Sequence, residues 1–442
     1  MNPYNFLESF DKFGAEGGFK PGLERINYLL DFFDHPEANL DIVHVAGSNG
    51  KGSTIAYLKN IYRAAGYSVG TFISPPLNRF NERIMIDERM ISTEELIELI
   101  KRIKPVVEKL EDSPDYTRPS FFEIVTLLAF LFFYEQKPDL VLLEVGLGGR
   151  LDATNVIPTP LLSIITEISR EHTQILGDTL ADIAAEKAGI IKKNCPVITG
   201  TKEPAARKVI QKKAELQNSK LTVIQEEYNY RILNSSLEGQ TIIVKPSDKS
   251  LAVSSNKEYQ IRLKIPGQHQ IRNALVALGA VEKLHKSYPV QKQTIEQSFC
   301  NTKWPGRFEI IAVTPYIILD GAHNPSALKE LLNVFKQNSH DFERLMMVIS
   351  VLQSKDIEVM GRQLAHLAEA QKLQITITQN NNFRAESPKK IAAVFRKYAL
   401  KYNIIFDFKE ALERTAEKCS AADLLCITGS LYTVAEARSI LK

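Results

Sequence analysis

The chain has 442 residues, with 55 lysines and arginines against 52 aspartates and glutamates, and a hydrophobic fraction of 44%. At roughly 100–200 residues per domain, this length predicts two to four domains, each able to bury its own core. The 24% charged fraction and the ordinary glycine and proline content exclude a collagen-like, disordered or low-complexity chain. The formal net charge of +3 is close to neutral, which argues against a protein that coats nucleic acid.

Cysteine usage and hydropathy predict the compartment. The four cysteines are far apart and form no Cys-x-x-Cys pair, which predicts reduced side chains without a disulfide framework or a zinc site. Residues 1–20 carry charges throughout and have no apolar core of signal-peptide length. The most apolar stretch, residues 121–134, opens with a Ser-x-x-Glu capping box at Ser120 and Glu123 and is shorter than the roughly 20 residues that span a bilayer. We therefore expect a buried helix there, in a soluble cytoplasmic protein.

The predicted elements begin with an apolar strand over residues 41–46, followed by a glycine-rich turn and a helix over about residues 53–65. Two further apolar runs, at residues 140–145 and 161–168, follow prolines and read as strands. Continuous apolar strands between helices are typical of a parallel sheet that is covered on both faces.

The pattern then changes to alternation of polar and apolar side chains, at residues 228–233, 241–245 and 259–265. With a turn expected at Asn234-Ser235-Ser236, this alternation predicts a small antiparallel meander appended to the parallel domain. A helix over about residues 270–284 follows.

The last part of the chain predicts a second domain. Beyond a junction at residues 301–307, apolar strands alternate with helices, and the strands are expected at residues 316–319, 345–351, 373–378 and 424–428. The fold class is therefore α/β: a larger N-terminal domain over residues 1–300, with a parallel sheet and the antiparallel appendage, and a smaller Rossmann-like domain over residues 301–442.

The strongest chemical signal is the loop Gly-Ser-Asn-Gly-Lys-Gly-Ser-Thr, between the first strand and its helix. Backbone N–H groups and a helix N-terminus can surround a polyphosphate in this context, where glycines allow close approach. Lys51 would meet the β- and γ-phosphates, and Ser53 or Thr54 would hold Mg²⁺. The spacing departs from the usual Walker pattern, because an extra glycine follows the lysine. An ordinary strand-to-helix turn is the alternative, but the lysine and paired hydroxyls favour a P-loop-type ATPase domain. The predicted nucleotide-binding residues of the loop are Gly47, Asn49, Gly50, Lys51, Gly52, Ser53 and Thr54.

Two polar residues at strand ends point to the same site. Glu144 closes the second apolar strand, where a carboxylate beside a phosphate loop can hold a metal directly or through water. The alternative is a carboxylate that caps the next segment. His172 follows the third strand, and it reads either as a metal ligand or as a hydrogen-bonding loop residue.

Further segments follow the loop in a specific order: Ser74-Pro75-Pro76-Leu77, Asn81-Glu82-Arg83-Ile84, Glu144 through Asn155, Glu186-Lys187-Ala188-Gly189-Ile190, Leu319 through Pro325, and Thr428-Gly429-Ser430-Leu431-Tyr432. Together with the loop, they resemble the folylpolyglutamate synthases, which are relatives of the bacterial cell-wall Mur ligases. The Lys51-Gly52-Ser53 order resembles the folate branch more than the cell-wall branch.

The resemblance implies an ATP-dependent amide ligation. ATP phosphorylates a carboxylate of a folate to an acyl phosphate, and the amino group of L-glutamate attacks it, giving an amide, ADP and phosphate. Because forming the acyl phosphate brings two anions together, cations must neutralise the charge while positioning supplies the rest. The implied small-molecule substrates are folate, L-glutamate and ATP, with Mg²⁺ as the metal, and we expect a monomer with no nucleic-acid or membrane partner.

The resemblance also implies roles for individual residues. The catalytic residues would be Lys51, Lys187 and His323. In this family the lysine that matches Lys187 is carbamylated, which turns it into an anionic oxygen ligand near the metal; from the residues alone, a solvated lysine near a helix end is the alternative. His323 would lie near the glutamate site, or it would cap a turn. The implied magnesium ligands are Ser53, Ser74, Glu144 and His172.

Nucleotide and folate contacts are implied as well. Asn273, Arg307 and Asp320 would contact ATP, which would then lie between the domains, so that closure excludes water from the acyl phosphate. The implied folate-binding residues are Ser120, Phe121, Phe122, Glu123, Leu151, Asp152 and Ala153. The two phenylalanines would stack on the pterin, or they would belong to the core.

Two departures from the family pattern concern the folate pocket. Pro76 stands where the family often has histidine, and Glu171 stands where aspartate usually precedes the metal-binding histidine. They leave the choice of substrate open, including whether dihydropteroate is accepted. A Mur-type ligase of a cell-wall precursor and a nucleotide switch without ligation are the rival readings.

Overall fold

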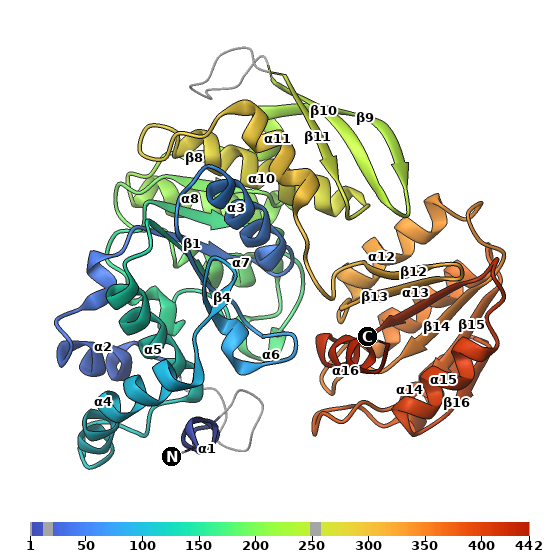
Figure 1. The fold of residues 1–442 in the computed structure, drawn as a ribbon, viewed down its shortest axis with the longest axis horizontal. Helices are drawn as coiled ribbons and strands as arrows, with labels where there is room; N and C mark the ends of the chain where they lie inside the picture. The colour runs from blue at the N-terminus through green and yellow to red at the C-terminus, as the bar shows by residue number, and fades with distance from the viewer. Residues whose placement is uncertain (1, 12–20, 248–257, 442) are drawn as a thin grey trace. The chain divides into compact units, whose positions relative to one another are not determined.

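The computed structural model describes residues 2–11, 21–247 and 258–441. Residues 12–20, which belong to the N-terminal segment discussed above, lie outside this part of the chain. The described residues form two compact units (Figure 1). Of the described residues, the first unit contains 2–11, 21–230, 244–247, 258–259 and 272–299, and the second contains 231–243, 260–271 and 300–441.

The first unit is built on a mixed sheet. Its described strands are β1 (Ile42–Ala46), β2 (Val69–Phe72), β3 (Ile84–Ile86), β4 (Arg89–Met90), β5 (Leu140–Glu144), β6 (Leu162–Ile165), β7 (Val197–Thr199) and β8 (Leu221–Val223). They lie in the order β4-β3-β2-β5-β1-β6-β7-β8. Pairing is parallel from β2 to β8 and antiparallel where β3 and β4 extend the edge. The predicted parallel arrangement is therefore confirmed for the central strands.

Strand order explains where the loops of the first unit meet. The central strand β1 lies between β5 and β6, and all three strands are buried at every position, as their continuous apolar runs require. Because parallel strands end at the same edge, the loops that follow β1, β5, β6 and β2 converge there.

Helices and short turns connect the strands. In chain order, the described helices are α1 (Pro3–Glu8), α2 (Glu24–Asp31), α3 (Lys51–Ala64), α4 (Thr93–Glu111), α5 (Phe121–Gln136), α6 (Thr173–Leu176), α7 (Leu180–Ala188), α8 (Pro204–Leu216), α9 (Ile224–Glu227), α10 (Gln268–Lys283), α11 (Lys292–Asn301), α12 (Pro325–Gln337), α13 (Ile357–Ala368), α14 (Pro388–Lys397), α15 (Phe408–Glu417) and α16 (Leu431–Leu441), with short 3₁₀ turns η1 (Pro36–Asn39), η2 (Phe80–Arg83) and η3 (Ala153–Val156). The predicted capping box of α5 is confirmed, because Ser120 and Glu123 bond each other's backbone N–H.

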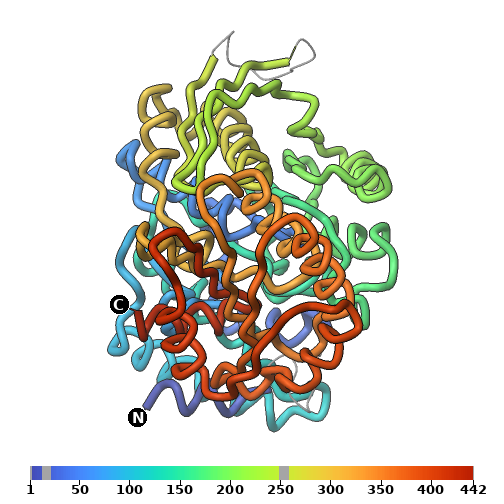
Figure 2. Tube along the Cα trace, turned by 90° about the vertical axis from the view of Figure 1, so that its right-hand side faces the viewer, coloured from blue at the N-terminus to red at the C-terminus, as the bar shows by residue number. Residues whose placement is uncertain are grey.

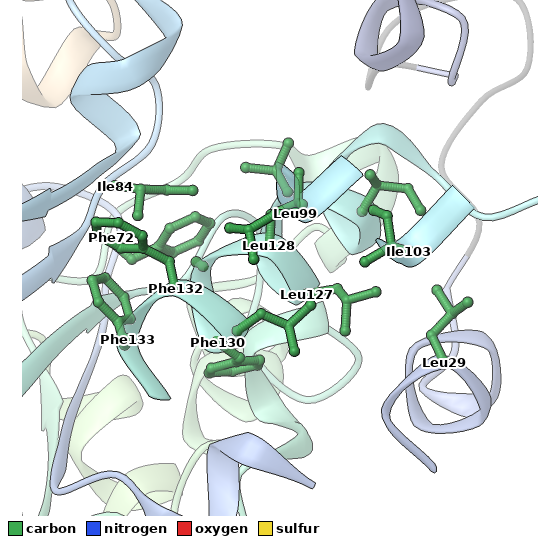
Figure 3. Close-up of a cluster of buried hydrophobic side chains, with 14 of the residues drawn as sticks. Leu29, Phe72, Ile84, Leu99, Ile103, Leu127, Leu128, Phe130, Phe132 and Phe133 are labelled. Atoms are coloured by element: carbon green, nitrogen blue, oxygen red, sulfur yellow. The ribbon is translucent and has the colours of Figure 1, made fainter. Parts of the chain in front are cut away.

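A large apolar core covers one face of the first sheet. Figure 3 shows side chains of α2, α4, α5, β2 and β3 packed together, among them Leu29, Leu99, Leu128 and Phe130. Helix α5 is apolar on nearly all sides, which fits its burial within this cluster. Its 16 residues are fewer than the roughly 20 that span a bilayer. No helix in the described residues combines the length and apolar character that crossing a bilayer requires.

The antiparallel meander is confirmed. Its strands are β9 (Tyr228–Ser236), β10 (Gly239–Pro246) and β11 (Tyr259–Leu263), in the order β11-β10-β9. The turn expected at Asn234-Ser235-Ser236 is wrong, because these residues continue β9 and the chain turns after them. Strand β9 lies at the edge of the sheet and is exposed after its first residue, so polar side chains are tolerated within it.

The second unit, drawn largely in orange to red in Figures 1 and 2, contains another mixed sheet. Its described strands are β12 (Glu309–Val313), β13 (Tyr316–Asp320), β14 (Leu345–Ile349), β15 (Leu373–Ile377), β16 (Tyr402–Ile404) and β17 (Leu424–Thr428). They lie in the order β12-β13-β17-β14-β15-β16, and β12 alone among them pairs antiparallel. The core of this unit also includes Leu237 and Ile265, from the earlier segments of the chain.

Candidate active site

The phosphate loop connects β1 to α3, which begins at Lys51, two residues before the predicted start. Gly47 and Gly50 have φ angles of +148° and +90°, a region that favours glycine. A Cβ on Gly47 would lie 1.9 Å from the Thr166 hydroxyl oxygen, and a Cβ on Gly50 would lie 2.3 Å from the Asn273 amide oxygen. The tight turn thus brings Asn273, a predicted nucleotide residue from α10, against the loop.

The loop is held from the β6 side. The Ser48 backbone N–H donates to the Glu167 carbonyl at 2.7 Å, and the Asn49 amide donates to the Ser169 hydroxyl at 3.1 Å. The Thr166 hydroxyl donates to the Asn49 carbonyl at 2.8 Å. These bonds fix the loop on the neighbouring strand, as preorganised phosphate binding requires.

Two lysines converge on the loop. The ammonium groups of Lys51 and Lys187 each donate to the Gly47 carbonyl oxygen at 3.0 Å. Lys187 also forms an ion pair with Glu171, with 2.9 Å between Nζ and Oε1. The side chain of Lys187 is only 3% exposed, so the alternative of a solvated helix-end lysine is wrong.

The ionisation of this cluster follows from its geometry. Burial lowers the pKa of the Lys187 amine; Glu171 opposes this effect and Lys51 adds to it. Burial alone would raise the pKa of the Glu171 carboxyl, but the charges of Lys187, Lys51 and His172 outweigh it and lower the pKa to about 2. Glu171 is therefore an anion at neutral pH, between cationic neighbours.

The Glu144 carboxylate lies at the end of β5, beside the loop. It accepts a hydrogen bond from the Ser74 backbone N–H at 3.0 Å and lies 3.9 Å from Lys51 Nζ. The Ser74 hydroxyl in turn accepts from Arg83 at 3.0 Å. A carboxylate at a phosphate loop fits Mg²⁺, which takes one or two carboxylates together with substrate phosphates and water.

The other predicted metal residues lie near the phosphate loop. Ser53 belongs to the helix that begins at the loop, and His172 directly follows Glu171, which pairs with Lys187. Ser53 is 7% exposed, in the first turn of α3. Thr54 is fully buried, and its hydroxyl has no hydrogen-bond partner in the described structure, so it faces the interior. His172 precedes α6 with a left-handed backbone, at φ 49° and ψ 37°, immediately after Glu171. Across the described residues, no group of three or more His, Cys, Asp or Glu side chains is arranged around a metal position.

The predicted folate residues fall into two places in the first unit. Ser120 and Glu123 form the cap of α5, and the buried Glu123 carboxylate lies 3.1 Å from Arg25. Phe121 and Phe122 are half-buried against the apolar core, and the Phe122 ring lies 5.7 Å from that of Phe72. The described contacts thus place both rings at the edge of the core.

The remaining folate residues follow β5. Leu151 is half-buried, whereas Asp152 and Ala153 are 4% and 5% exposed. Asp152 caps η3 and accepts hydrogen bonds from the backbone of Thr154 and Leu147.

The second unit brings Arg307, Asp320 and His323 together. Asp320, at the end of β13, accepts from the Phe308 and Ala322 N–H groups at 2.8 Å and 2.9 Å. Burial raises the pKa of the Asp320 carboxyl, and the nearby Arg307 charge opposes that shift. His323 Nδ1 lies 2.9 Å from the Gly321 carbonyl oxygen, a contact that fits the turn-capping alternative.

Some site residues were not predicted. Thr166, Ser169 and Glu171 contact the loop or its lysines, but in the sequence Glu171 appeared only as a departure from a family pattern. Their place in the chain could have indicated them, because all three residues follow the end of β6, as His172 does.

Comparison with known proteins agrees with this geometry. Residues 45–281 match the Mur ligase middle domain, and residues 306–431 match the Mur ligase glutamate ligase domain. The fold and the phosphate loop therefore define an ATP-dependent ligase of the Mur type. The chain is 36% identical over 431 residues to the dihydrofolate synthase/folylpolyglutamate synthase of Bacillus subtilis, a match that covers 96% of each chain. The protein belongs to the folylpolyglutamate synthase/dihydrofolate synthase family, which confirms the resemblance seen in the sequence.

Solved structures support the same assignment. The folylpolyglutamate synthase of Thermotoga maritima matches with a TM-score of 0.81 and 32% identity, covering 99% of this chain and 95% of that one. FolC of E. coli in complex with DHPP and ADP matches with a TM-score of 0.85 and 26% identity, covering 100% of this chain and 98% of that one.

Proposed function

We propose that this protein uses ATP to ligate L-glutamate to a folate, and that it acts on dihydropteroate as well as on tetrahydrofolate and its polyglutamates. The observation that carries this proposal is the 36% identity with the Bacillus subtilis protein over 96% of each chain. The name of that protein includes both activities. The similar E. coli structure holds DHPP and ADP, which supports a folate precursor and a nucleotide as the ligands of this protein.

The phosphate loop supplies the first step. ATP would lie on the Gly47–Gly50 turn, where Lys51 faces the transferred phosphoryl group and its charge offsets the approach of the folate carboxylate. The carboxylate oxygen attacks the γ-phosphorus, ADP leaves, and an acyl phosphate forms. The amine of glutamate then attacks the acyl carbon, and phosphate leaves with the C–O electrons as the amide forms.

Metal binding is proposed at the carboxyl ends of β2 and β5. Ser53, Ser74, Glu144 and His172 would hold Mg²⁺ together with phosphate oxygens, and the ion would supply positive charge to the polyphosphate. The hydrogen bond from the Ser74 backbone N–H to Glu144 supports this choice, because it brings the two residues together beside the phosphate loop. Arg307 and Asp320 are assigned to ATP, and His323 to glutamate, by their match to the family.

Lys187 is proposed to act as a carbamate. Its neutral amine attacks carbon dioxide, a C–N bond forms, and the nitrogen loses its proton, which leaves an anion with two oxygens. Burial favours the neutral amine that this step requires, because it lowers the pKa. A carbamate beside Glu171 places two anions together, so the arrangement needs a cation between them, which Lys51 and Mg²⁺ can supply.

Ligation is tested directly with the purified protein, ATP, Mg²⁺ and glutamate, offered dihydropteroate and tetrahydrofolate in separate reactions. Mass spectrometry of the products should show addition of one glutamate to dihydropteroate and of one or more to tetrahydrofolate. Release of ADP without any amide would indicate a nucleotide switch instead, and a product from tetrahydrofolate alone would limit the protein to polyglutamylation.

The carbamate is tested by substitution. Lys187→Ala and Lys187→Arg should both lower kcat by about a hundredfold, because neither side chain can form the anion. Acetate should restore part of the activity of Lys187→Ala by occupying the vacated space. Lys193→Arg is the matched control, because this exposed lysine lies six positions along the chain. Near-normal turnover of Lys187→Arg would refute the carbamate.

A further inference from the structure

The carboxylate of Asp152 is enclosed by its own loop. Its Oδ2 atom accepts from the Leu147 N–H at 2.8 Å. Its Oδ1 atom accepts from the Thr154 N–H at 3.1 Å and from the Thr154 hydroxyl at 2.6 Å. Asp152 is 4% exposed, so these bonds tie residues 147 and 154 to one buried carboxylate. Asp152 therefore acts as the internal anchor of the loop that follows β5.

Behind this anchor lies His44, in the middle of the central strand β1. His44 is fully buried, and its Nε2 atom lies 2.8 Å from the Thr154 hydroxyl oxygen. Since that hydroxyl has a single proton and gives it to Asp152, it must accept from His44, so the imidazole carries its proton on Nε2. Burial, with a smaller contribution from Lys192, lowers the pKa of His44 to about 3, so the ring is neutral.

The hydrogen-bond chain runs in one direction, from His44 through Thr154 to Asp152. His44 Nδ1 has no hydrogen-bond partner among the described residues, so the hydrogen bond that the structure gives for this ring is the one between Nε2 and the Thr154 hydroxyl. A buried polar group on a central strand is costly unless its bonds are satisfied, and an apolar residue would fill the same position at lower cost. The chain of bonds explains why a histidine lies here.

The anchored loop is packed against the helix that carries Lys187. The Arg150 N–H donates to the Glu186 carbonyl at 2.8 Å, and the Asn155 amide donates to the Gly189 carbonyl at 3.2 Å. A Cβ on Gly189 would lie 2.4 Å from the Arg150 Cα atom, so the backbones are in direct contact. The loop therefore cannot shift freely once Asp152 fixes it.

We propose that His44 and Thr154 are positioning residues for folate binding, because the donor chain His44–Thr154–Asp152 holds the loop after β5 in its binding conformation. This inference rests on the proposed function and on the assignment of Leu151, Asp152 and Ala153 to the folate that the family resemblance implies. Neither His44 nor Thr154 needs to touch the substrate, and their effect passes through the Asp152 carboxylate.

The test compares two substitutions of one hydroxyl. Thr154→Val keeps the shape and removes both side-chain hydrogen bonds, and it should raise the KM for dihydropteroate or tetrahydrofolate about tenfold. The KM for ATP should stay within about twofold, and Thr154→Ser, which keeps the hydroxyl, should stay within about twofold for both substrates. A parallel rise in both KM values, or equal damage from Val and Ser, would overturn the inference.

A matched control comes from the second unit. The Thr415 hydroxyl is also buried and bonds the Thr376 hydroxyl at 2.9 Å. Thr415→Val should lower the unfolding temperature as Thr154→Val does, without changing the KM for folate. This comparison separates loss of a buried hydrogen bond from loss of the folate-binding conformation.

The relay through His44 is tested by a double-mutant cycle. If His44 acts through Thr154, the folate KM of His44→Leu with Thr154→Val should equal that of Thr154→Val alone. Additive effects would overturn the relay. Should His44→Leu fail to fold, His44→Gln keeps an N–H donor and should stay within about threefold of the wild type. A wild-type protein inactive on every folate would refute the proposed function, whereas an active wild type with an unaffected Thr154→Val would refute this inference alone.

Discussion

Lys51 and Lys187 come from different helices, and both direct their ammonium groups to one carbonyl oxygen, that of Gly47. Two like charges at about 4 Å repel by about 4 kcal/mol at an effective dielectric of 20, so the arrangement needs nearby anions. Glu171 pairs with Lys187, and Glu144 lies 3.9 Å from Lys51. Once Lys187 is converted to the proposed carbamate, Lys51 remains as the cation at Gly47 that can meet a bound polyphosphate.

Lys51→Ala should lower kcat/KM for ATP by at least about a hundredfold, because it removes the cation at the transferred phosphoryl group. The unfolding temperature should stay near that of the wild type. Lys59→Ala is the control: this lysine lies on the same helix, and its ammonium faces Glu88 at 3.4 Å. Steady-state kinetics with varied ATP measure this difference. An equal kcat/KM for ATP in the two variants would contradict the phosphate-loop assignment.

Arg307→Ala should raise the KM for ATP about tenfold while leaving the KM for folate unchanged, because the guanidinium is assigned to the nucleotide. Its Nη1 atom lies 3.5 Å from the Gly321 carbonyl oxygen, and its charge opposes the raised pKa of Asp320. Arg438→Ala, which removes an ion pair with Glu309, serves as the control. A larger effect on folate than on ATP would reassign Arg307.

At the scale of elements, ion pairs fix how neighbouring strands begin. Asp423 precedes β17, and its carboxylate accepts from Arg344, which precedes β14, at 2.9 Å and 2.6 Å. It also accepts from the Ser420 N–H and hydroxyl at 2.7 Å and 2.8 Å. The hydrogen bond from Arg344 is the main cause that lowers the pKa of Asp423 to about 2.

Asp423→Asn should lower the free energy of unfolding by about 2 kcal/mol at pH 7, because it removes the charge that pairs with Arg344, whose side chain is 37% exposed and therefore partly screened by solvent. The folded pKa lies below the unfolded value, so this stabilisation is complete above about pH 4 and is lost as the pH falls toward 2. Urea unfolding at pH 7 and pH 3 should therefore show a smaller difference between wild type and variant at pH 3. Glu413→Gln, in an exposed pair with Lys409, should change stability by about 0.5 kcal/mol or less. A difference that does not depend on pH would contradict this account.

The sequence predicted the long buried elements well, because burial leaves a strong local pattern. Strands β1, β5 and β17 and helix α5 lie where their apolar runs and capping residues placed them. Strands β8, β12 and β16 are short or lie at sheet edges, with half-buried or exposed side chains, and their composition carries little periodicity. The polar end of β9 was read as a turn for the same reason.

The site was predictable only in part. Gly47 and Lys51 belong to a contiguous motif whose spacing carries its own chemistry. The bonds from Ser48 and Asn49 to residues beyond β6 join positions about 120 apart in the chain. They exist because β6 is the neighbour of β1, and strand order is not encoded in any local stretch.

For the whole molecule, the second unit is discontinuous in sequence. Residues 231–243 and 260–271 belong to it, although the chain returns to the first unit for residues 272–299 before entering it finally. Leu237 and Ile265 are buried in its core with side chains of α12, β13 and β14. The stability of this unit therefore depends on residues far upstream of residue 300.

Leu237→Ala should lower the stability of the second unit by about 3 kcal/mol, because it leaves a cavity in the core. Leu233→Ala should have almost no effect, since this leucine is 45% exposed on β9. Hydrogen exchange of the full chain, followed for amides of β13 and β14, reports the stability of this unit separately. Equal protection in the two variants would show that the upstream segment contributes nothing to it.

Because the second unit is discontinuous in sequence, the parts of its core are synthesised at different times. The ribosome makes Leu237 and Ile265 well before β13, β14 and β17, whose side chains complete their core. At about 5–20 residues per second, roughly 10 to 40 seconds separate Leu237 from the end of the chain. During that interval the Leu237 and Ile265 side chains of the nascent protein lack their final partners, so aggregation during synthesis should depend on translation rate and chaperone supply in this window.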